Sequence, residues 1–388
     1  MESTLRSLIA DSRINRSAAF AVLGRGSASG FFAGACLIRD DIVPVDRFRV
    51  IGASLPEMAR AEWSTSPLAD SPETEMWSRT IGALGGKTIW RRMADLRFGL
   101  VGCGRSGSVA AALIASLGIN KLTLIDPDQL DLHCFGECDL VHEVPGGLGQ
   151  VKSRVLATAL EQRLNSARRF LTNSPGADAV GSFQLEPDLP ILGVPESIYS
   201  WPGLIATKQA DLLACLVDRP VARLAAAFLS KLYLIPLLDV GTGVFYEATG
   251  QRRMGADIRF FLPQDRCILC LGGVTGARGF GTEGTDIPLA PERATWRQQR
   301  AGSLRTLNQT AVSFGIQLVV DFLCGRVRNS VWLHLEYSDD GIPELQSRSS
   351  LAVADCRLCA LAGLGDEGLR EFPALIQSLS RGYEAGLV

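Results

Sequence analysis

The sequence predicts an α/β protein whose main domain is a doubly wound parallel sheet, and two features of the chain lead to this prediction. The first is the stretch from residue 98 to residue 128, in which apolar runs, a glycine-rich turn and a run of small residues alternate. The second is a series of short apolar runs and helix-like segments that continues to about residue 260. Apolar runs without polar alternation are typical of parallel strands that helices cover on both faces.

The overall composition is that of an ordinary globular protein. The chain has 388 residues, a formal net charge of −2 and 47% hydrophobic residues. This balance argues against a nucleic-acid partner and against an anionic membrane surface. The first residues lack the apolar segment of a signal peptide and no apolar run is long enough to span a membrane, so we expect a cytoplasmic protein. Ten cysteines in such a chain favour thiols or a metal site over disulfides.

Residues 1–75 are predicted to form a separate, small α+β module of unknown role. Short strands are expected at Ala18–Leu23, Phe31–Ile38 and Ile42–Val50. Residues 21–45 are similar to the opening strands of JAB/MPN isopeptidase domains, but the zinc-binding His pair of such a domain is absent. We therefore expect a remnant or a docking module rather than a protease. Residues 61–75, with two prolines and several Ser and Thr, are predicted to be a linker.

Residues 76–362 are predicted to form the main domain, and residues 363–388 a tail helix. Helices are expected before residue 97 and at 108–117, 152–163, 220–228 and 304–324. Strands are expected at 98–101, 122–125, 179–184, 212–217, 232–239 and 331–337, with a loop or short helix at 199–208. The runs 244–246 and 259–262 predict an antiparallel extension of the sheet.

The glycine-rich turn predicts a nucleotide site in a Rossmann-like domain. Gly102, Gly104 and Gly107 form G-x-G-x-x-G between a predicted strand and a predicted helix. Such glycines allow a tight turn, close approach of a phosphate and packing of the helix on the sheet, while the helix N-terminus holds the anion. Asp126 follows Gly107 by 19 residues, about where a ribose-binding acid is expected. The motif alone is also compatible with a tight turn that binds nothing, but its context favours a nucleotide.

Two C-x-x-C pairs predict a structural metal site. Cys267 and Cys270 form one pair, and Cys356 and Cys359 form the other. Four thiolates complete a tetrahedral zinc site and leave no open position for catalysis, so the Zn²⁺ would be structural. The alternatives are four buried free cysteines or a redox-active pair.

The nucleotide turn and the four cysteines together resemble the ThiF/MoeB/HesA family, the bacterial relatives of ubiquitin-activating enzymes, over roughly residues 76–362. The resemblance implies ATP and Mg²⁺ as ligands, a homodimer, and a ubiquitin-like or sulfur-carrier protein with a Gly tail as partner. The resemblance also assigns roles to single residues. It implies that Arg79 reaches the triphosphate, often that of the neighbouring subunit, that Asp126 of the D-x-D formed with Asp128 binds ribose, and that Lys152 of G-x-x-K contacts phosphate. It further implies that Asp218 is linked to Mg²⁺, that Arg223 matches a following arginine, and that both C-x-x-C pairs bind zinc.

These implied roles suit the activation of a carboxylate by ATP. The carboxylate attacks the α-phosphorus and pyrophosphate leaves, so fixed cations must face the phosphate oxygens. Lys152, Arg79 and a magnesium ion held by Asp218 would meet this need. Taken singly, a lysine or arginine is usually a solvated surface charge, and Asp218 could cap the helix that begins near Pro220. At these spacings behind one nucleotide turn, the functional interpretation is favoured.

Two departures from the family pattern stand out. Where the family has N-L-x-R after D-x-D, this chain has Cys134 to Glu137. At about 6 Å and an effective dielectric of about 20, each unit charge near the triphosphate is worth roughly 3 kcal/mol. Reversing the sign would therefore cost on the order of 10³ in rate or more, unless Glu137 points away or another cation substitutes. Arg105, inside the turn, is a candidate to compensate as a nucleotide contact, or else a solvated loop residue. The segment of residues 272–302, where the family carries a thioester cysteine, contains no Cys.

We therefore expect an enzyme that adenylates the C-terminal carboxylate of a ubiquitin-like or sulfur-carrier protein, or of a peptide, and passes the acyl-adenylate to an external acceptor. A second hypothesis is a degenerate nucleotide-binding scaffold that recruits such a partner without catalysis. Glu137 favours the scaffold, whereas Lys152, Arg79 and Asp218 favour the enzyme. A Rossmann dehydrogenase is a distant third, because no hydride-transfer site is evident and the C-x-x-C tetrad is unexplained by it.

Overall fold

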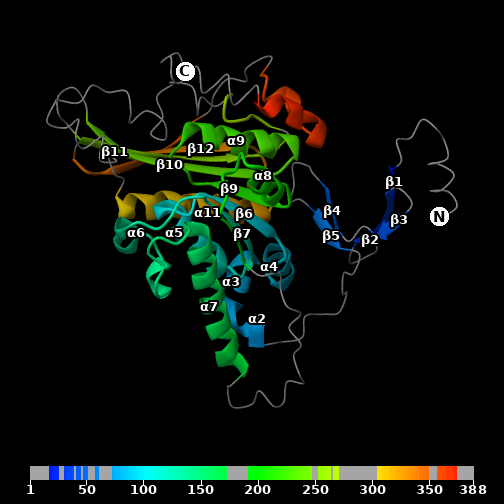
Figure 1. The fold of residues 1–388 in the computed structure, drawn as a ribbon, viewed down its shortest axis with the longest axis horizontal. Coiled ribbons are helices and arrows are strands. Elements are labelled where there is room, and N and C mark those ends of the chain that lie inside the picture. Colours follow the sequence, from blue (N-terminus) through cyan, green and yellow to red (C-terminus); the bar gives the residue numbers. More distant parts are fainter. Residues whose placement is uncertain are drawn as a thin grey trace. The chain divides into compact units, whose positions relative to one another are not determined.

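A computed structural model gives the fold of the chain in two units, residues 1–71 and 72–388, each described here by itself (Figure 1). The structure describes residues 17–25, 30–38, 41–44, 47–50, 57–60, 72–172, 191–246, 252–263, 265–270, 304–338, 340–348 and 356–373. Within these ranges no helix has the length and apolar character that crossing a membrane requires.

The described part of the first unit consists of strands. Its three-stranded antiparallel sheet has the order β1-β2-β3, and a two-stranded sheet pairs β4 with β5. The strands are β1 (Ser17–Arg25), β2 (Gly30–Ile38), β3 (Asp41–Pro44), β4 (Arg47–Val50) and β5 (Glu57–Arg60). The single strand expected at Ile42–Val50 is therefore two strands in separate sheets, the first of which ends at Pro44. Proline lacks the N–H that a continuing ladder needs. Of the predicted linker, residues 61–71 lie outside the described residues, and α2 (Pro72–Met76) follows.

The larger unit is built on an eight-stranded sheet with the order β13-β12-β11-β10-β9-β6-β7-β8. Strands β8, β7, β6, β9 and β10 are parallel, and β11, β12 and β13 continue the sheet from β10, each antiparallel to the strand before it. The parallel strands are β6 (Arg97–Val101), β7 (Lys121–Ile125), β8 (Leu192–Val194), β9 (Leu212–Cys215) and β10 (Leu237–Tyr246). The antiparallel strands are β11 (Arg252–Phe261), β12 (Val331–Tyr337) and β13 (Pro343–Arg348). The predicted Rossmann-like fold with an antiparallel extension is confirmed.

Helices cover both faces of this sheet (Figure 1). One face carries α8 (Trp201–Lys208) and α9 (Pro220–Leu232), and the other carries α5 (Arg105–Ser116), α7 (Lys152–Thr172) and α11 (Arg305–Leu323). Helix α9 is rich in Ala and Leu and is buried along most of its length, so it forms one centre of the core together with β9 and β10. On the opposite face, α11 packs beside α5 and across β10 and β11. This double coverage explains why the parallel strands lack polar alternation.

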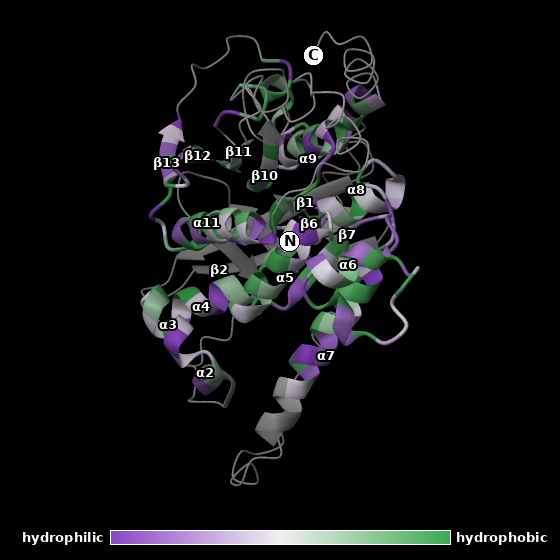
Figure 2. Cartoon of the chain, turned by 90° about the vertical axis from the view of Figure 1, so that its left-hand side faces the viewer, coloured by the Kyte–Doolittle hydropathy of each residue, from purple (hydrophilic) through white to green (hydrophobic). Residues whose placement is uncertain are grey.

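Shorter helices complete the unit. They are α3 (Ser78–Leu84), α4 (Lys87–Ala94), α6 (Leu132–Glu137) and the 3-10 helices η1 (Val141–Glu143), η3 (Cys359–Leu361) and η4 (Gly365–Glu371). The described part of the predicted tail helix thus contains a 3-10 helix, and residues 374–388 lie outside the described residues, as does the strand expected at 179–184. Strand β13 was not predicted, because it is an edge strand whose residues are mostly hydrophilic (Figure 2) and almost all exposed.

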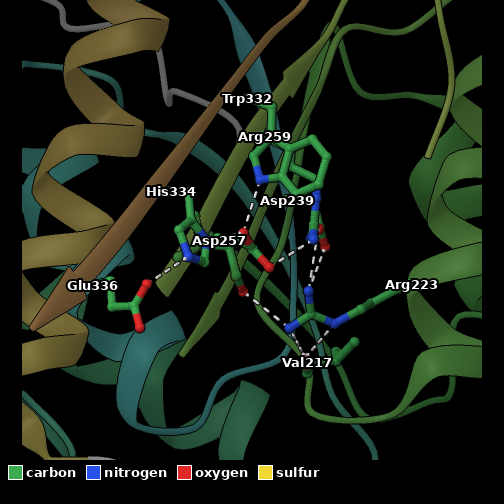
Figure 3. A network of polar contacts seen from close by, with 9 residues as sticks. Val217, Arg223, Asp239, Asp257, Arg259, Trp332, His334 and Glu336 are labelled. Atoms are coloured by element: carbon green, nitrogen blue, oxygen red, sulfur yellow. Dashed lines mark hydrogen bonds and ion pairs between the residues drawn. The ribbon is translucent and has the colours of Figure 1, made fainter. Parts of the chain in front are cut away.

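A buried ionic network joins the parallel and antiparallel parts of the sheet (Figure 3). Arg259 on β11 is fully buried and pairs with Asp239 at 3.0 Å and with Asp257 at 2.8 Å. Asp257 also accepts hydrogen bonds from Trp332 Nε1 at 2.8 Å and lies 2.9 Å from His334 Nδ1. Arg223 on α9 reaches Asp239 at 3.1 Å. Since buried charges are costly unless paired, each of these groups depends on the others.

The acid stability of the protein should reflect Asp257. Burial raises the pKa of this carboxyl, but Arg259 and the hydrogen bonds from His334 and Trp332 outweigh burial and lower it to about 2, from 3.8. A depressed pKa stabilises the fold above pH 4, and this contribution is lost as the pH falls toward 2. It amounts to about 2 kcal/mol of unfolding free energy. Urea unfolding at pH 5 and at pH 2.5 would measure the loss.

The matched variants are Asp257→Asn and Trp332→Phe. Asp257→Asn leaves Arg259 with one carboxylate fewer, so it should lower the unfolding free energy at pH 5 by about 3 kcal/mol and flatten the slope below pH 4. Trp332→Phe removes one donor and should produce a smaller change of the same sign. A wild-type slope that persists unchanged in Asp257→Asn would mean that another group is responsible.

Candidate nucleotide site and cysteine cluster

The phosphate turn connects the end of β6 to the start of α5. Gly102 has φ +92°, and a Cβ there would lie 2.9 Å from the Leu216 carbonyl oxygen. A Cβ on Gly107 would lie 1.8 Å from the Gly102 carbonyl oxygen, so only glycine allows α5 to start this close to the turn. A Cβ on Gly104, the N-cap residue of α5, would have no atom within 4 Å. Because Gly104 brings no capping side chain, the first N–H groups of α5 can receive an anion.

Asp126 holds this turn against the end of β7. Its carboxylate accepts hydrogen bonds from the Cys103 N–H at 2.6 Å and from the Asp128 N–H at 2.8 Å. The residue is 7% exposed, and burial raises the pKa of its carboxyl. The ribose contact expected of Asp126 stays a prediction, and in this structure the side chain shapes the phosphate turn.

Lys152, the first residue of α7, lies beside the same turn. Its ammonium group is 3.0 Å from an oxygen of Asp128, and its backbone N–H donates to the Asp128 carbonyl. Burial lowers the pKa of Lys152, but the carboxylates of Asp126 and Asp128 raise it by more than burial lowers it. The pKa therefore lies above its ordinary value, and the lysine is a cation. The neighbouring Ser153 hydroxyl contacts the carbonyl oxygens of Asp126 and Val194, at 2.9 and 3.0 Å, and so fixes the start of α7 to β7 and β8. Sequence reasoning missed Ser153.

Arg105, the first residue of α5, forms an ion pair with Glu137. The Arg105 guanidinium lies 2.5 Å from Glu137 Oε2, and their side chains are 24% and 41% exposed. The two residues that depart from the family pattern therefore neutralise each other. Arg105 is thus not a purely solvated loop residue, because its guanidinium pairs with Glu137.

Asp218 follows β9 at the same edge of the sheet and is exposed. The preceding Val217 lies against the phosphate turn, since its Cγ1 would be 2.9 Å from a Cβ on Gly102. Arg223 fixes this segment by donating to the Val217 carbonyl from Nε at 3.1 Å and from Nη2 at 2.9 Å (Figure 3). Each nitrogen of Arg223 is bonded to a protein oxygen, and the residue is 2% exposed. The structure thus places Arg223 as a support of the Asp218 segment, within the ionic network, rather than at the phosphate turn.

Arg79 lies at the opposite end of α5 from the phosphate turn. It is exposed on α3, two residues after Trp77, whose indole N–H donates to the Ser116 carbonyl at 3.2 Å. Trp77 also packs against Trp90, with ring centroids 5.8 Å apart. The 12 residues of α5 span about 18 Å. The structure therefore does not bring Arg79 to the phosphate turn of its own chain.

The four cysteines of the C-x-x-C pairs converge, although 85 residues separate Cys270 from Cys356 in the sequence (356 − 271 = 85). Their sulfur atoms all lie within 4.8 Å of one another, and three pairs are 3.5, 3.6 and 3.7 Å apart. Tetrahedral zinc with Zn–S bonds of about 2.3 Å requires sulfur atoms about 3.8 Å apart. The donor set and its spacing fit a structural zinc ion.

A buried lysine, which sequence reasoning missed, braces this cluster. Lys231 on α9 is 2% exposed, and its ammonium donates to the carbonyl oxygens of Pro263, at 2.8 Å, and of Asp265. Its own carbonyl accepts from the Gly363 N–H at 3.0 Å. Lys231 therefore fixes the chain on both sides of the cluster, and its charge opposes the negative charge of four thiolates.

Metal analysis should find one zinc per chain, held by the cluster. The double variant Cys267→Ser/Cys356→Ser should lose the metal and unfold at a temperature lower by about 5 °C or more, because metal binding and folding are coupled. Cys324→Ser, which changes a cysteine outside the cluster, should do neither. Well under one zinc per chain in undamaged wild-type protein would refute the metal site.

Comparisons with known proteins agree with this geometry. Residues 77–173 match the model of the ThiF family. Among solved structures, E. coli MccB alone has a TM-score of 0.51, with 16% identity over 75% of this chain and 73% of MccB. E. coli MccB with AMPCPP and MccA gives 0.50 and 16% over 75% of both chains, and MccB with MccA-N7isoASN gives 0.50 and 16% over 78% of this chain and 77% of MccB.

Identity this low shows a shared fold and no more. A comparison by sequence with curated proteins finds no match. The matched segment contains the phosphate turn, Asp126, Asp128 and Lys152. The predicted resemblance to the ThiF family is therefore confirmed over residues 77–173, and the larger unit has the fold of MccB.

Proposed function

We propose that the larger unit binds ATP with Mg²⁺ and adenylates a carboxylate. The observation that carries this proposal is the convergence of the phosphate turn, Asp126, Asp128 and Lys152 at the carboxyl edge of β6 and β7, within the segment that matches the ThiF family. In a doubly wound sheet this edge is where ligands bind, at the point where the strand order reverses. Here the reversal lies between β6 and β9.

The reaction requires a site that binds and stabilises the phosphate anions. A carboxylate oxygen attacks the α-phosphorus, the bond to the bridging oxygen breaks, and pyrophosphate leaves. The N–H groups at the start of α5 bind the phosphate, and Lys152 supplies a fixed positive charge in a buried position, where it acts more strongly than in water. Asp218, exposed at the end of β9, is a suitable oxygen ligand for Mg²⁺, which neutralises phosphate charge when bound.

The substrate we propose is the C-terminal carboxylate of a peptide or of a ubiquitin-like or sulfur-carrier protein with a Gly tail. Solved structures of MccB with the same fold contain MccA, which supports a peptide-like partner. Because residues 272–302 contain no Cys, we propose that the acyl-adenylate passes directly to an external thiol, sulfur donor or amine.

A second candidate is a scaffold that binds nucleotide and partner without catalysis. The pairing of Arg105 with Glu137 favours it, since a site with fewer net positive charges stabilises a charged transition state less. The two candidates differ in turnover, not in binding.

ATP–pyrophosphate exchange separates the two. With Gly-tailed carrier proteins and short peptides as carboxylate donors, wild-type protein should exchange label, and Lys152→Ala and Asp218→Ala should each reduce exchange by about 10² or more. Lys208→Ala is the matched control. Lys208 is an exposed lysine of α8, away from the turn, and it pairs with Asp366 of η4. ATP binding without exchange for any carboxylate would support the scaffold instead.

A homodimer in which Arg79 serves the partner's site makes a separate prediction. Lys152→Ala and Arg79→Ala should each be inactive alone, yet mixing them in equal amounts should restore about a quarter of wild-type exchange, because half of the dimers are mixed and each contains one complete site. Light scattering would report the dimer. A monomer at assay concentration, or no recovery on mixing, would contradict action of Arg79 between subunits.

A further inference from the structure

The Arg105–Glu137 pair joins the start of α5, directly after the phosphate turn, to the end of α6. Arg105 is the first residue of α5, so its side chain starts where the helix N-terminus meets an anion. Glu137 is the last residue of α6, and its Oε2 is shielded from solvent and faces Arg105 at 2.5 Å. A carboxylate of the chain thus occupies a position in which a phosphate oxygen would also be stabilised.

The segment that carries Glu137 is anchored on both sides. Cys134 and Cys138, one before and one after it, are buried at 1% and 3% exposure. The Asp139 N–H donates to the Ser108 hydroxyl of α5 at 2.9 Å, and the Asp139 carboxylate pairs with Arg305 of α11. Glu137 therefore has little freedom to withdraw, and the longer arginine side chain is the partner that can change position.

Both cations beside the turn have carboxylate partners of their own chain. Arg105 lies 2.5 Å from Glu137, and Lys152 lies 3.0 Å from Asp128. The four side chains carry no net charge together, whereas a triphosphate needs positive charge around it. Binding of ATP therefore has to compete with these carboxylates for the same two cations.

We propose that Glu137 is an internal counterion of the phosphate turn, which holds Arg105 when no nucleotide is bound and yields it to the triphosphate. This rests on the proposed function and extends it, because it assigns to Glu137 the control of affinity for ATP and for pyrophosphate. Arg105 returns to Glu137 when pyrophosphate leaves, so the same carboxylate favours release of this product. Glu137 touches no reacting atom and acts as a positioning residue through Arg105.

Nucleotide binding by calorimetry tests the proposal, with MgATP, pyrophosphate and AMP as the probes. Glu137→Gln should tighten binding of MgATP and pyrophosphate about tenfold. The effect is no larger because the pair is partly exposed and solvent screens its charges. AMP, with less negative charge, should gain less than threefold. In exchange assays the KM for ATP should fall while kcat changes less than about twofold.

Two variants make the interpretation specific. Glu143→Gln removes the same charge from an exposed residue of η1 and should leave MgATP affinity unchanged. In an Arg105→Gln background, the gain from Glu137→Gln should shrink to less than about threefold, because Glu137 acts through Arg105. Glu137→Asp, which keeps the charge and shortens the side chain, should fall between wild type and Glu137→Gln and guards against a folding defect in the amide variant.

The failures of the two proposals are distinguishable. Wild-type protein that binds no MgATP would overturn the proposed function. Wild-type protein that binds and exchanges ATP, while Glu137→Gln has unchanged or weaker MgATP affinity, would overturn the counterion alone. An equal gain with and without Arg105 would also overturn it, since Glu137 would then act directly on the phosphates.

Discussion

The larger unit depends on the close approach of α5 to the end of β6. Gly107 lies so near the Gly102 carbonyl that a single methyl group would overlap it at 1.8 Å. This contact places the helix N-terminus directly over the carboxyl edge of the sheet, beside the point where the strand order reverses between β6 and β9. Asp126, Lys152 and the Asp218 segment are arranged around the resulting turn, because each follows a neighbouring strand or begins the next helix. One backbone constraint therefore gathers residues that are up to 116 positions apart in sequence (218 − 102 = 116).

The sequence allowed most elements of this unit to be predicted, since apolar runs and helix-like segments report burial directly. Helix α5 and strands β6, β7 and β12 lie within a few residues of their expected positions. The errors have physical causes. Helix α9 continues to Leu232 because tertiary burial covers its whole length, so β10 starts later than expected. Strand β13 was not predicted because an exposed edge strand does not require the alternation of apolar and polar residues from which strands are recognised.

The candidate site was predictable where a motif fixes local geometry and not where charges meet across the fold. The glycine turn and the four cysteines came from spacing, and Lys152 came from the resemblance to the ThiF family; the structure places Lys152 beside Asp128 and brings the four cysteines together. The partners of Arg223, by contrast, are Asp239 on β10 and the Val217 carbonyl, and only the folded sheet shows that its donors are occupied. Lys231 presents the same difficulty, because the sequence of a helix does not indicate that one of its lysines will be buried against two carbonyl groups.

The ion pairs at the turn and those within the sheet have different physical consequences. In the sheet, Arg259 and Asp257 are fully buried, so separating them would leave a charge without solvent or partner, and the network is effectively permanent. At the turn, the Arg105 and Glu137 side chains are 24% and 41% exposed, so solvent lowers the cost of separation. Lys152 and Asp128 combine the two situations, since the lysine side chain is 8% exposed and the carboxylate is 58% exposed. The permanent pairs therefore hold the Asp218 segment in place, while the more exposed pairs at the turn can separate at a lower free-energy cost, which the proposed exchange of Arg105 from Glu137 to a triphosphate requires.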